Sequence, residues 1–527
     1  MPGTTQRGDT VYAAAKALTD PDGPALIFEP SGRVVSWSEF EGMANRVAHL
    51  VRRVGLVKGD HLALFMENIP EVLMTEAGAE RTGIYFTPIN SYLSADEAAY
   101  IINNSQSRIV VTSAAKAEVA TQLPERCPHV ERWIMVAPPG QTPAPFESWD
   151  AALGALSTEH VADEALGMPM LYSSGTTGQP KGIHRPMPDA HPSDMSIPTQ
   201  FLAQLWGFRE GMVYLSPAPL YHAAPQSSCA IALRLGATSV VMEHFDPALF
   251  LALVERHRVT NAQVVPTMFG RMLKLPDEVR SPADVSSLEV VVHAAAPCPV
   301  PIKHQMIQWF GPILLEYYAA TESNGLTAID SEDWMAHPGS VGRCLHGQLL
   351  ILNDDGEECP PGEPGTVWFG GATNFEYFDD PEKTAANRRD GGQTSTVGDV
   401  GYVDNDGYLY LTDRKAHMII SGGVNVYPQE TENLLATHPS VLDVAVIGVP
   451  DEDLGEAVLA VVQTVDGVEG DDALAQELTE YCRSQLAHFK CPRRIDFVDE
   501  LPRLPTGKLY KGPLREKYWA DHATQIV

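Results

Sequence analysis

A chain of 527 residues is longer than a single hydrophobic core usually serves, so two or more domains are expected. The formal net charge of −31 argues against a nucleic acid or an anionic membrane surface as partner. The seven cysteines show no CxxC pair or zinc spacing, and the sequence has no apolar signal core and no apolar run of bilayer length, so we expect a cytoplasmic protein with reduced thiols and no membrane insertion.

The first part of the chain alternates strand and helix patterns. Apolar residues recur at helical spacing from Phe40 to Val54, behind Ser38 as the predicted N-cap and before Gly55 as the stop. The next predicted elements are a strand at 61–65, a helix at 69–81, a strand at 85–88, a helix at 95–103 and a strand at 108–112. This alternation predicts a largely parallel sheet with helices on its faces.

The stretch from Leu171 to Ile183 reads LYSSGTTGQPKGI. Its glycines let backbone N–H groups approach an anion, its hydroxyls donate hydrogen bonds, and the ammonium of Lys181 adds positive charge. The spacing does not fit the P-loop pattern, so a GTPase or kinase site is not indicated. An ordinary surface loop is the alternative for such a composition.

Three histidines follow this loop. His184 and His191 lie in an irregular stretch up to Pro198, and their spacing fits no standard set of metal ligands. His222 lies in PAPLYHAAPQ, just after a predicted strand at 212–216. A lone histidine in such a place is more often structural than catalytic, so its role depends on the wider context of the chain.

The rest of the chain changes pattern twice. Buried strands are predicted at 240–242, 262–265 and 290–293, and short hairpins follow from Leu349 onward. After about residue 413, the predicted elements are a helix at 428–437, strands at 444–449 and 458–463, a helix at 472–486 and a strand at 494–498. The motif DNDG at 404–407 lacks a first carboxylate because Tyr402 stands there, so we reject calcium.

YSSGTTGQPKG closely resembles the signature loop of the adenylate-forming superfamily, which includes acyl-CoA synthetases, peptide-synthetase adenylation domains and luciferases. Four more stretches are similar to its motifs and extend the resemblance over most of the chain: ILLEYYAATES at 313–323, TVGDVGYVD at 396–404, LTDRKAHMIISGG at 411–423 and LPRLPTGKLYK at 501–511. Among these enzymes, the chain most resembles the acid–CoA ligases.

The resemblance implies a fold and a domain organisation. The fold is α/β, with a large N-terminal domain of βαβ-type sheets flanked by helices, a small β-rich subdomain at about 345–413, and a small mobile α+β C-terminal domain. The implied boundaries are 1–413 for the AMP-binding domain and 414–527 for a lid that carries the catalytic lysine. Ala416 stands at the hinge position, where the family commonly has Asp or Lys.

The resemblance also assigns residues to ATP, magnesium and CoA. Residues of the signature loop would bind the phosphates: Ser173, Ser174, Gly175, Thr176, Thr177, Gly178 and Lys181. Tyr318 would stack on adenine beside Ala295 and Tyr317, Thr321 would bond the α-phosphate, and Asp399 and Arg414 would bind the ribose. Glu322 and Thr176 would hold Mg²⁺, while Gly422 and Gly423 would border the CoA channel.

The implied catalytic residue is Lys508, supported by Glu322, Thr321 and His222. His222 would also lie beside the acyl pocket, which the small residues Ala223, Ala224, Ala296 and Ala319 would line. Ala319 departs from the usual glycine, so an extra methyl would shorten or tighten that pocket. Small side chains at 223 and 224 favour a bulky fatty, aryl or alicyclic acid over acetate.

The implied reaction joins a small-molecule carboxylic acid to CoA through acyl-AMP, with ATP, Mg²⁺ and CoA required. A peptide-synthetase adenylation domain, another stand-alone adenylation enzyme with a different acceptor, a luciferase-like oxygenase and a non-catalytic nucleotide-binding module stay as alternatives. The joint presence of Lys181, Glu322, Asp399, Arg414 and Lys508 argues against the last. The sequence leaves open whether the chain is a monomer or a homodimer.

Overall fold

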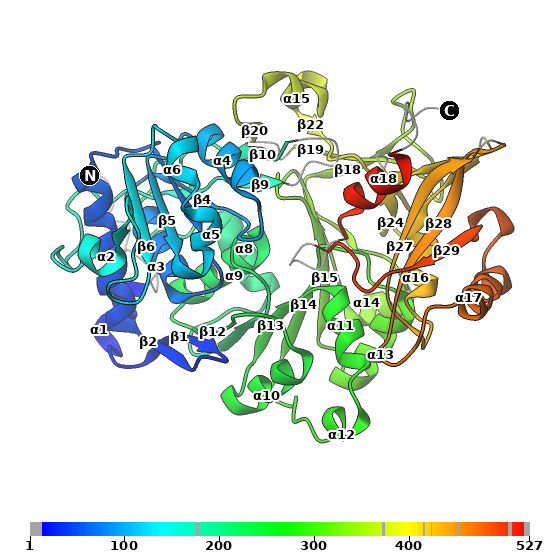
Figure 1. The fold of residues 1–527 in the computed structure, drawn as a ribbon, viewed down its shortest axis with the longest axis horizontal. Coiled ribbons are helices and arrows are strands. Elements are labelled where there is room, and N and C mark those ends of the chain that lie inside the picture. Colours follow the sequence, from blue (N-terminus) through cyan, green and yellow to red (C-terminus); the bar gives the residue numbers. More distant parts are fainter. Residues whose placement is uncertain are drawn as a thin grey trace, which may run out of the picture. The chain divides into compact units, whose positions relative to one another are not determined.

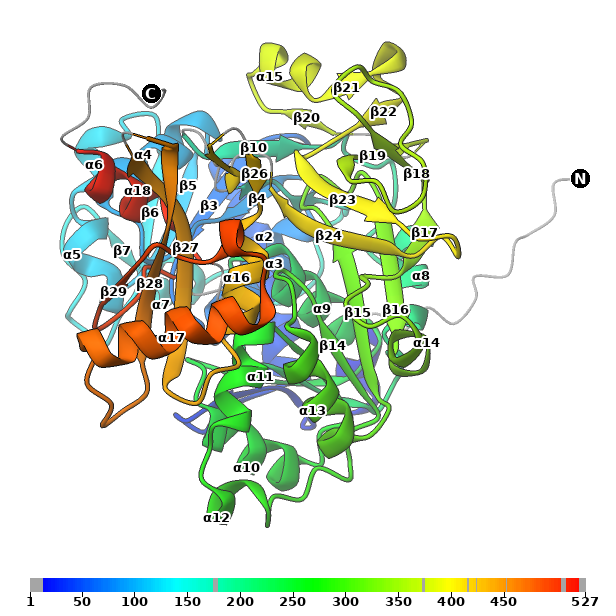
Figure 2. The ribbon, with the colours of Figure 1, turned by 90° about the vertical axis from the view of Figure 1, so that its right-hand side faces the viewer.

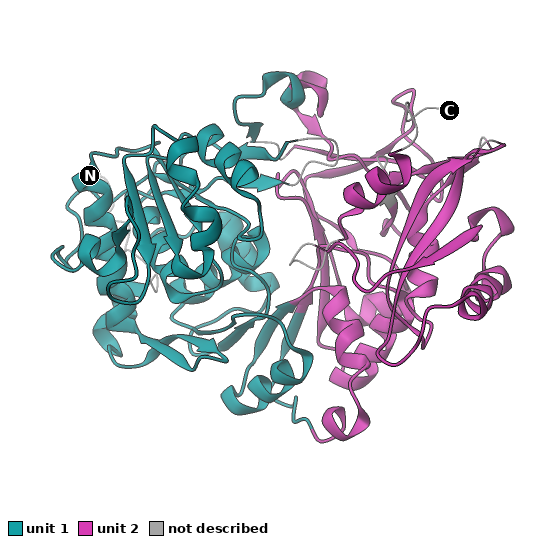
Figure 3. Ribbon diagram, viewed as in Figure 1, with its two compact units in different colours: residues 1–263, 283–291, 374–384 teal, residues 264–282, 292–373, 385–527 magenta. Residues whose placement is uncertain are grey.

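The computed structural model describes residues 13–173, 179–371, 375–414, 417–422, 424–451, 453–503 and 509–520. The chain forms two compact units (Figure 3): unit 1 holds residues 1–263, 283–291 and 374–384, and unit 2 holds 264–282, 292–373 and 385–527. The predicted domain boundary at residue 414 marks a hinge, which this division into compact units does not test. It therefore stays a prediction. Among the described residues, no helix is long and apolar enough to cross a membrane.

The first sheet of unit 1 is parallel throughout, in the order β7-β6-β5-β3-β4-β8. Figure 1 labels three of its strands, β4, β5 and β6. Its strands are β3 (His61–Phe65), β4 (Tyr85–Pro88), β5 (Ile109–Ser113), β6 (Arg132–Val136), β7 (Glu147–Ser148) and β8 (Met168–Pro169). The connecting helices include α3 (Pro70–Glu80), α4 (Ala95–Asn104), α5 (Ala117–Ala120), α6 (Leu123–Arg126) and α7 (Trp149–Leu153). The predicted strand–helix alternation and parallel sheet are confirmed here.

Helix α2 (Trp37–Val54) has the predicted apolar face and ends at Gly55, whose φ of 81° suits a residue without a side chain. The predicted N-cap, Ser38, is wrong. The chain leaves strand β2 (Arg33–Ser36) and enters the helix at once, so Ser36 caps it by accepting the N–H of Glu39 at 3.2 Å.

The second sheet of unit 1 holds β1 (Pro24–Glu29), β2, β11 (Val213–Ser216), β12 (Thr238–Met242) and β13 (Asn261–Val264). Pairs β1–β12, β12–β11 and β11–β13 are parallel, and β1–β2 is antiparallel. Other helices of this unit include α1 (Ala13–Thr19), α8 (Ile197–Leu205), α9 (Ala223–Arg234) and α10 (Pro247–His257). Strand β14 (Val290–His293) follows β13 in the chain and matches the predicted bounds.

Unit 2 contains two antiparallel arrangements. Strands β15 (Leu314–Ala319), β16 (Leu326–Asp330) and β17 (Arg343–His346) pair in that order, and helices α11 (Pro266–Leu273) and α13 (Val300–Phe310) pack together. The second is the predicted β-rich region, with strands β18 (Gln348–Leu352), β19 (Gly365–Gly370), β21 (Arg388–Arg389), β22 (Thr394–Ser395), β23 (Asp399–Val403) and β24 (Leu409–Arg414). Both predicted hairpins, β18–β19 and β23–β24, are antiparallel as expected.

The C-terminal part is built on a long hairpin, β27 (Val441–Asp451) and β28 (Gly455–Thr464), which Figure 2 shows with its neighbours. The remaining elements are β25 (Ile419–Ser421), β26 (Val424–Val426), α16 (Pro428–Leu435), α17 (Asp472–Gln485), β29 (Arg494–Phe497) and α18 (Lys511–Trp519). The two hairpin strands are longer than predicted because their ends are less apolar than their centres. This α+β composition agrees with the expectation.

Candidate active site

Strands β9 (Leu171–Ser173) and β10 (Lys181–His184) frame the signature loop. They pair in antiparallel register, with Ser173 opposite Lys181. The ammonium of Lys181 lies 4.8 Å from the ring centroid of Tyr377, on strand β20 (Glu376–Tyr377). Two of the predicted phosphate-binding residues therefore stand across from each other at the base of the loop. The other five, Ser174, Gly175, Thr176, Thr177 and Gly178, lie outside the described residues.

Unit 2 contains a cavity of about 750 Å³. It brings together four residues predicted to bind the nucleotide, Ala295, Tyr317, Tyr318 and Asp399, and two predicted to line the acyl pocket, Ala296 and Ala319. These residues come from the loop after β14, from strand β15 and from the start of β23. Segments about 100 residues apart in the sequence thus line one hollow of ligand size.

Tyr318 and Asp399 are directly linked in this cavity. The Tyr318 hydroxyl donates to Asp399 Oδ2 at 2.7 Å, and the Tyr318 ring lies 6.1 Å from the ring of Phe369. Arg414 is the register partner of Asp399 in the β23–β24 hairpin, so the two residues predicted to bind ribose stand opposite each other on the backbone. The side chain of Arg414 lies outside the described part of the structure.

Thr321 and Glu322 lie just beyond β15, separated from its last residue by Ala320. Glu322 is buried, and the next residue, Ser323, has a φ of 53°, in the left-handed region that few non-glycine residues adopt. Ala295 has a φ of 74° and is likewise unusual. Such backbone strain is frequent at ligand sites, and here it occurs on two of the segments that carry predicted nucleotide contacts. A buried carboxylate is the kind of hard oxygen ligand that suits Mg²⁺.

His222 stands at the N-cap position of α9 without a capping hydrogen bond from its side chain, and Ala223 and Ala224 are the first residues of the helix. The His222 ring lies 4.4 Å from the ring of Tyr221, and all three predicted pocket residues are half-buried. They belong to unit 1, whereas Ala296 and Ala319 belong to unit 2. Their joint role in an acyl pocket stays a prediction.

Gly422 forms the turn between β25 and β26. Its φ is 58°, and its N–H donates to the carbonyl of Leu454 at 2.8 Å. The positive φ favours glycine here, and an added side chain would also come within 3.1 Å of Leu454 Cδ2, a tight contact. Gly423, Ala416 and Lys508 lie outside the described residues. The residues around Lys508 are informative, because Arg503 and Leu509 pair as an antiparallel bridge, and both line the cavity that holds Tyr318.

The sequence reasoning missed a buried ionic cluster behind β15. Lys303 on α13 is fully buried, its ammonium lies 2.5 Å from Glu316 Oε2, and His293 Nε2 lies 3.6 Å from the same oxygen. Burial raises the pKa of Glu316 above its ordinary value, although Lys303 opposes this. Burial, and then the charge of Lys303, hold the pKa of His293 well below its ordinary range. Glu316 lies on the strand that carries Tyr318, so the cluster fixes the position of that strand.

A sequence signal for this cluster does exist. In the helix VPIKHQMIQWF, Lys303 occupies the same face as Met306, Ile307 and Phe310, at the i, i+3, i+4, i+7 spacing of an apolar stripe. A lysine within such a stripe indicates a buried partner, although the sequence does not say which one.

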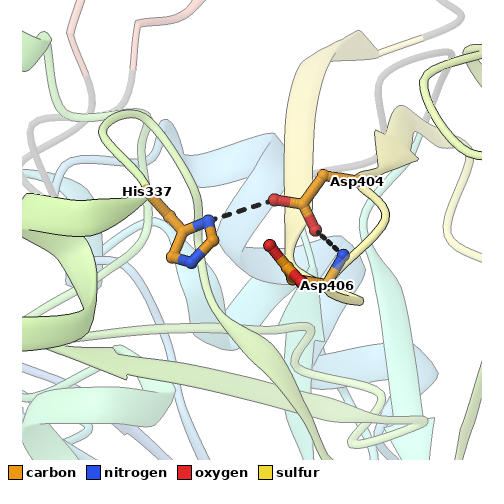
Figure 4. Close-up of side chains that lie close together, drawn as sticks. All are labelled: His337, Asp404 and Asp406. Atoms are coloured by element: carbon orange, nitrogen blue, oxygen red, sulfur yellow. Dashed lines mark hydrogen bonds and ion pairs between the residues drawn. The ribbon is translucent and has the colours of Figure 1, made fainter.

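One cluster of possible metal ligands occurs among the described residues, His337 with Asp404 and Asp406 (Figure 4). Asp404 Oδ1 accepts the N–H groups of Asp406 and Tyr408, each at 2.9 Å. Its Oδ2 lies 3.1 Å from His337 Nδ1 and accepts the Tyr410 hydroxyl at 3.2 Å. Both carboxylate oxygens therefore accept hydrogen bonds within the hairpin turn, and the rejection of calcium at DNDG stays a prediction.

The histidines after the signature loop have ordinary partners. His191 lies 3.1 Å from Glu164 through Nε2 and 2.7 Å from the Ser193 hydroxyl through Nδ1. His184 packs against the rings of Tyr85 and Phe378.

Known proteins are similar to this chain in sequence and in structure. The model of the AMP-binding enzyme family matches residues 13–378, and that of the AMP-binding enzyme C-terminal domain matches residues 430–508. The long-chain-fatty-acid–CoA ligase FadD13 of Mycobacterium tuberculosis is 32% identical over 501 residues, which cover 93% of this chain and 95% of the relative.

Two solved structures are similar over nearly their full length. The anthranilate CoA ligase AuaEII, in complex with anthranoyl-AMP, has a TM-score of 0.82 at 25% identity and covers 96% of each chain. ATP-bound MatB from Rhodopseudomonas palustris has a TM-score of 0.78 at 29% identity, covering 98% of this chain and 100% of that one. The first of these contains an acyl-adenylate and the second contains ATP.

Proposed function

The chain belongs to the AMP-binding enzyme family, and we propose from this premise how its residues divide the work of two half-reactions. It is an ATP-dependent, AMP-forming acid–CoA ligase. In the first half-reaction the acid carboxylate attacks the α-phosphorus of ATP, giving acyl-AMP and pyrophosphate. In the second, the CoA thiol attacks the acyl carbonyl, the thioester forms and AMP leaves.

The nucleotide site is proposed to lie in the cavity that holds Tyr318 and Asp399. The hydrogen bond between these two residues is the observation that carries the assignment, because it fixes an aromatic ring and a carboxylate side by side. A ring offers a stacking surface for adenine, and a carboxylate accepts hydrogen bonds from two ribose hydroxyls. Asp399 is only 7% exposed, so it is shielded from competing water.

The barrier to the first half-reaction is largely electrostatic. Two unit negative charges about 4 Å apart repel by roughly 4 kcal/mol at an effective dielectric of 20. The ammonium of Lys508, placed between the carboxylate and the α-phosphate, offsets this repulsion and stabilises charge in the transition state. Leu509, the residue that follows Lys508, lines the nucleotide cavity, which supports this placement.

Glu322 is proposed to hold Mg²⁺, which supplies positive charge to the triphosphate. Thr321 would donate its hydroxyl to the α-phosphate, and Lys181, at the base of the signature loop, would face the leaving pyrophosphate. No protein nucleophile is required in either step. In the second step Lys508 has no role, and the Gly422 turn borders the path of the thiol.

The acid is proposed to be a bulky fatty, aryl or alicyclic one. FadD13 is named for long-chain fatty acids and AuaEII for anthranilate, so both classes occur among similar proteins. The small side chains of Ala223 and Ala224 support a roomy pocket, whereas the methyl of Ala319 shortens it on another side. We expect the reaction to take place in the cytoplasm.

Pyrophosphate release tests the proposal, measured with and without CoA over short, fatty, aromatic and alicyclic acids. One acid class should give pyrophosphate and its CoA thioester. Lys508→Ala should slow adenylation by roughly 100-fold or more while still converting supplied acyl-AMP. The matched control is Lys517→Ala, because Lys517 is an exposed lysine in the same part of the chain.

Each alternative has its own outcome. Pyrophosphate release without a CoA thioester would indicate an adenylation enzyme with another acceptor. If no acid gives pyrophosphate, a nucleotide-binding module is the better description. If Lys508→Ala is as active as wild type, the role of Lys508 is wrong.

A further inference from the structure

A lysine at the end of α11 joins two distant segments of unit 2. Lys274 follows Leu273, the last residue of α11, and its ammonium donates to the carbonyl of Val441 at 2.6 Å and to that of Leu442 at 3.3 Å. These carbonyls belong to the first residues of β27, more than 160 residues later in the chain. A charged donor between two carbonyls makes a stronger and more specific contact than a neutral one.

The next residue of β27 continues this connection toward the C-terminus. Asp443 binds Arg503 with both carboxylate oxygens: Arg503 Nη2 donates to Oδ1 at 2.5 Å, and Arg503 Nε donates to Oδ2. Asp443 Oδ1 also accepts the N–H of Val444 at 2.8 Å, which fixes the carboxylate against its own strand. The position of Arg503 is therefore set by the position of β27.

Arg503 stands at the base of the loop that contains Lys508. It pairs with Leu509 as an antiparallel bridge, and the N–H of Tyr510 donates to the carbonyl of Pro502 at 2.8 Å. Lys274, Asp443, Arg503 and Leu509 all line the cavity that also holds Tyr318 and Asp399. A continuous series of contacts thus runs from α11 to both ends of the lysine loop, along the wall of the nucleotide site.

We propose that Lys274 is a positioning residue for the first half-reaction: by holding the start of β27 against α11, it keeps Arg503 and Leu509, the described residues on either side of the Lys508 segment, at the nucleotide cavity. This inference rests on the proposed function, in which Lys508 acts only in adenylation. The contact must break whenever β27 moves away from α11, so it favours the adenylating arrangement without serving the transfer to CoA. The proposed effect of Lys274 is exerted through the carbonyls of Val441 and Leu442, to which its ammonium donates.

The test uses the two half-reactions separately. Adenylation is measured as pyrophosphate release without CoA, and transfer as thioester formation from supplied acyl-AMP. Lys274→Met keeps the length of the side chain but removes the charge, and it should slow adenylation about 3- to 10-fold without slowing transfer. Lys274→Arg keeps a charged donor and should restore adenylation to within about twofold of wild type. Lys517→Met, at an exposed lysine, is the matched control and should change neither rate.

A double-mutant cycle adds a readout that a general loss of structure would not give. Because Lys274 and Arg503 act through the same strand, the variant with both Lys274→Met and Arg503→Met should be slowed less than the product of the two single effects. Equal slowing of both half-reactions by Lys274→Met, or no slowing of either, would overturn the proposal. If wild type itself releases no pyrophosphate, the proposed function fails instead, so the two failures are distinguishable.

Discussion

At the scale of single residues, the Tyr318–Asp399 hydrogen bond makes a specific prediction about ATP binding. Tyr318→Phe keeps the ring for stacking but removes the hydroxyl that orients Asp399. A hydrogen bond to a charged group is worth about 1.5–3 kcal/mol, and part of this is recovered from water. We expect the KM for ATP in pyrophosphate release to rise about 3- to 10-fold, with kcat nearly unchanged.

The matched control for this variant is Tyr402→Phe. Tyr402 lies on the same strand as Asp399, and its ring stacks on that of Tyr410 with 4.9 Å between the ring centroids. Tyr410 is also its partner in the β23–β24 pairing, whereas the partner of Asp399 is Arg414. A rise in KM for both variants would mean that the sheet as a whole has changed. That outcome would contradict the prediction that the Tyr318 hydroxyl orients Asp399.

A second residue-scale prediction concerns pH. Arg81 Nη1 lies 2.7 Å from Glu41 Oε1, His160 Nε2 lies 3.1 Å from the same oxygen, and His160 Nδ1 lies 2.8 Å from Glu164 Oε1. Hydrogen bonds to Glu164 and Glu41 raise the pKa of His160 to about 9, although burial opposes this. Burial would raise the pKa of Glu41, but the His160 hydrogen bond and the Arg81 charge lower it to about 2.

Because the folded-state pKa of His160 is raised, its contribution to stability is complete below about pH 6.5 and is lost as the pH rises toward 9. The Tm of wild type should therefore fall over this range. His160→Gln should lower the Tm at pH 6 and reduce that fall. His129→Gln, at an exposed histidine, should behave like wild type. An equal fall in the His160 variant would exclude His160 as the titrating group.

At the scale of elements, the turn between β23 and β24 depends on one carboxylate. Asp404 accepts hydrogen bonds from two backbone N–H groups and from Tyr410, and it contacts His337. Each hydrogen bond contributes about 0.5–1.5 kcal/mol to stability. Asp404→Ala should therefore lower the free energy of unfolding by about 2–4 kcal/mol and the Tm by several degrees. Asp406→Ala is the matched control, because Asp406 is exposed, and it should cost little. A rise in wild-type Tm on adding Mg²⁺ or Ca²⁺, abolished by Asp406→Ala, would mean that this turn is a metal site after all.

Helices and strands were predicted well where a regular apolar pattern ended at residues that break secondary structure. The bounds of β3, β4 and β14 match, and α2 ends at the predicted glycine, because each has a strong apolar pattern between clear breaks. Helix α9 was not predicted. Its sequence AAPQSSCAIALR carries a proline and two serines, which disfavour a helix in most positions, but the proline lies in the first turn, where its missing N–H costs nothing. The low helix propensity of these residues was thus outweighed by the place of the proline in the first turn.

The site could be predicted only in part. Motif resemblance named Tyr318 and Asp399, which the structure brings within hydrogen-bond distance, but it could not name Lys303, Glu316 or Lys274. Those residues act through contacts between elements whose mutual placement depends on the whole fold. A charged residue in the sequence also looks the same whether it is solvated or buried against a partner.

At the scale of the whole molecule, the predicted boundary at residue 414 can be tested by expression. The β27–β28 hairpin is covered on both faces within the C-terminal part. One core joins Val444, Val446 and Val458 to Leu478 of α17, and the other joins Ile447, Leu459 and Val461 to Leu514 of α18. A segment of about 110 residues with two such cores buries enough apolar surface to fold alone. We therefore expect the fragment 414–527 to show a single cooperative thermal transition and dispersed amide resonances.

The matched control is a fragment that starts at residue 385, where the division into compact units places a break. That fragment would include β22, β23 and β24 without β19, the strand with which β22 and β23 pair. Unpaired strand edges promote association, so the longer fragment should aggregate or unfold without cooperativity although it contains more of the chain. If instead 385–527 folds cooperatively and 414–527 does not, the β-rich strands belong to the C-terminal folding unit. The hinge would then have to lie before residue 385, and the lysine loop would move together with Asp399 instead of relative to it.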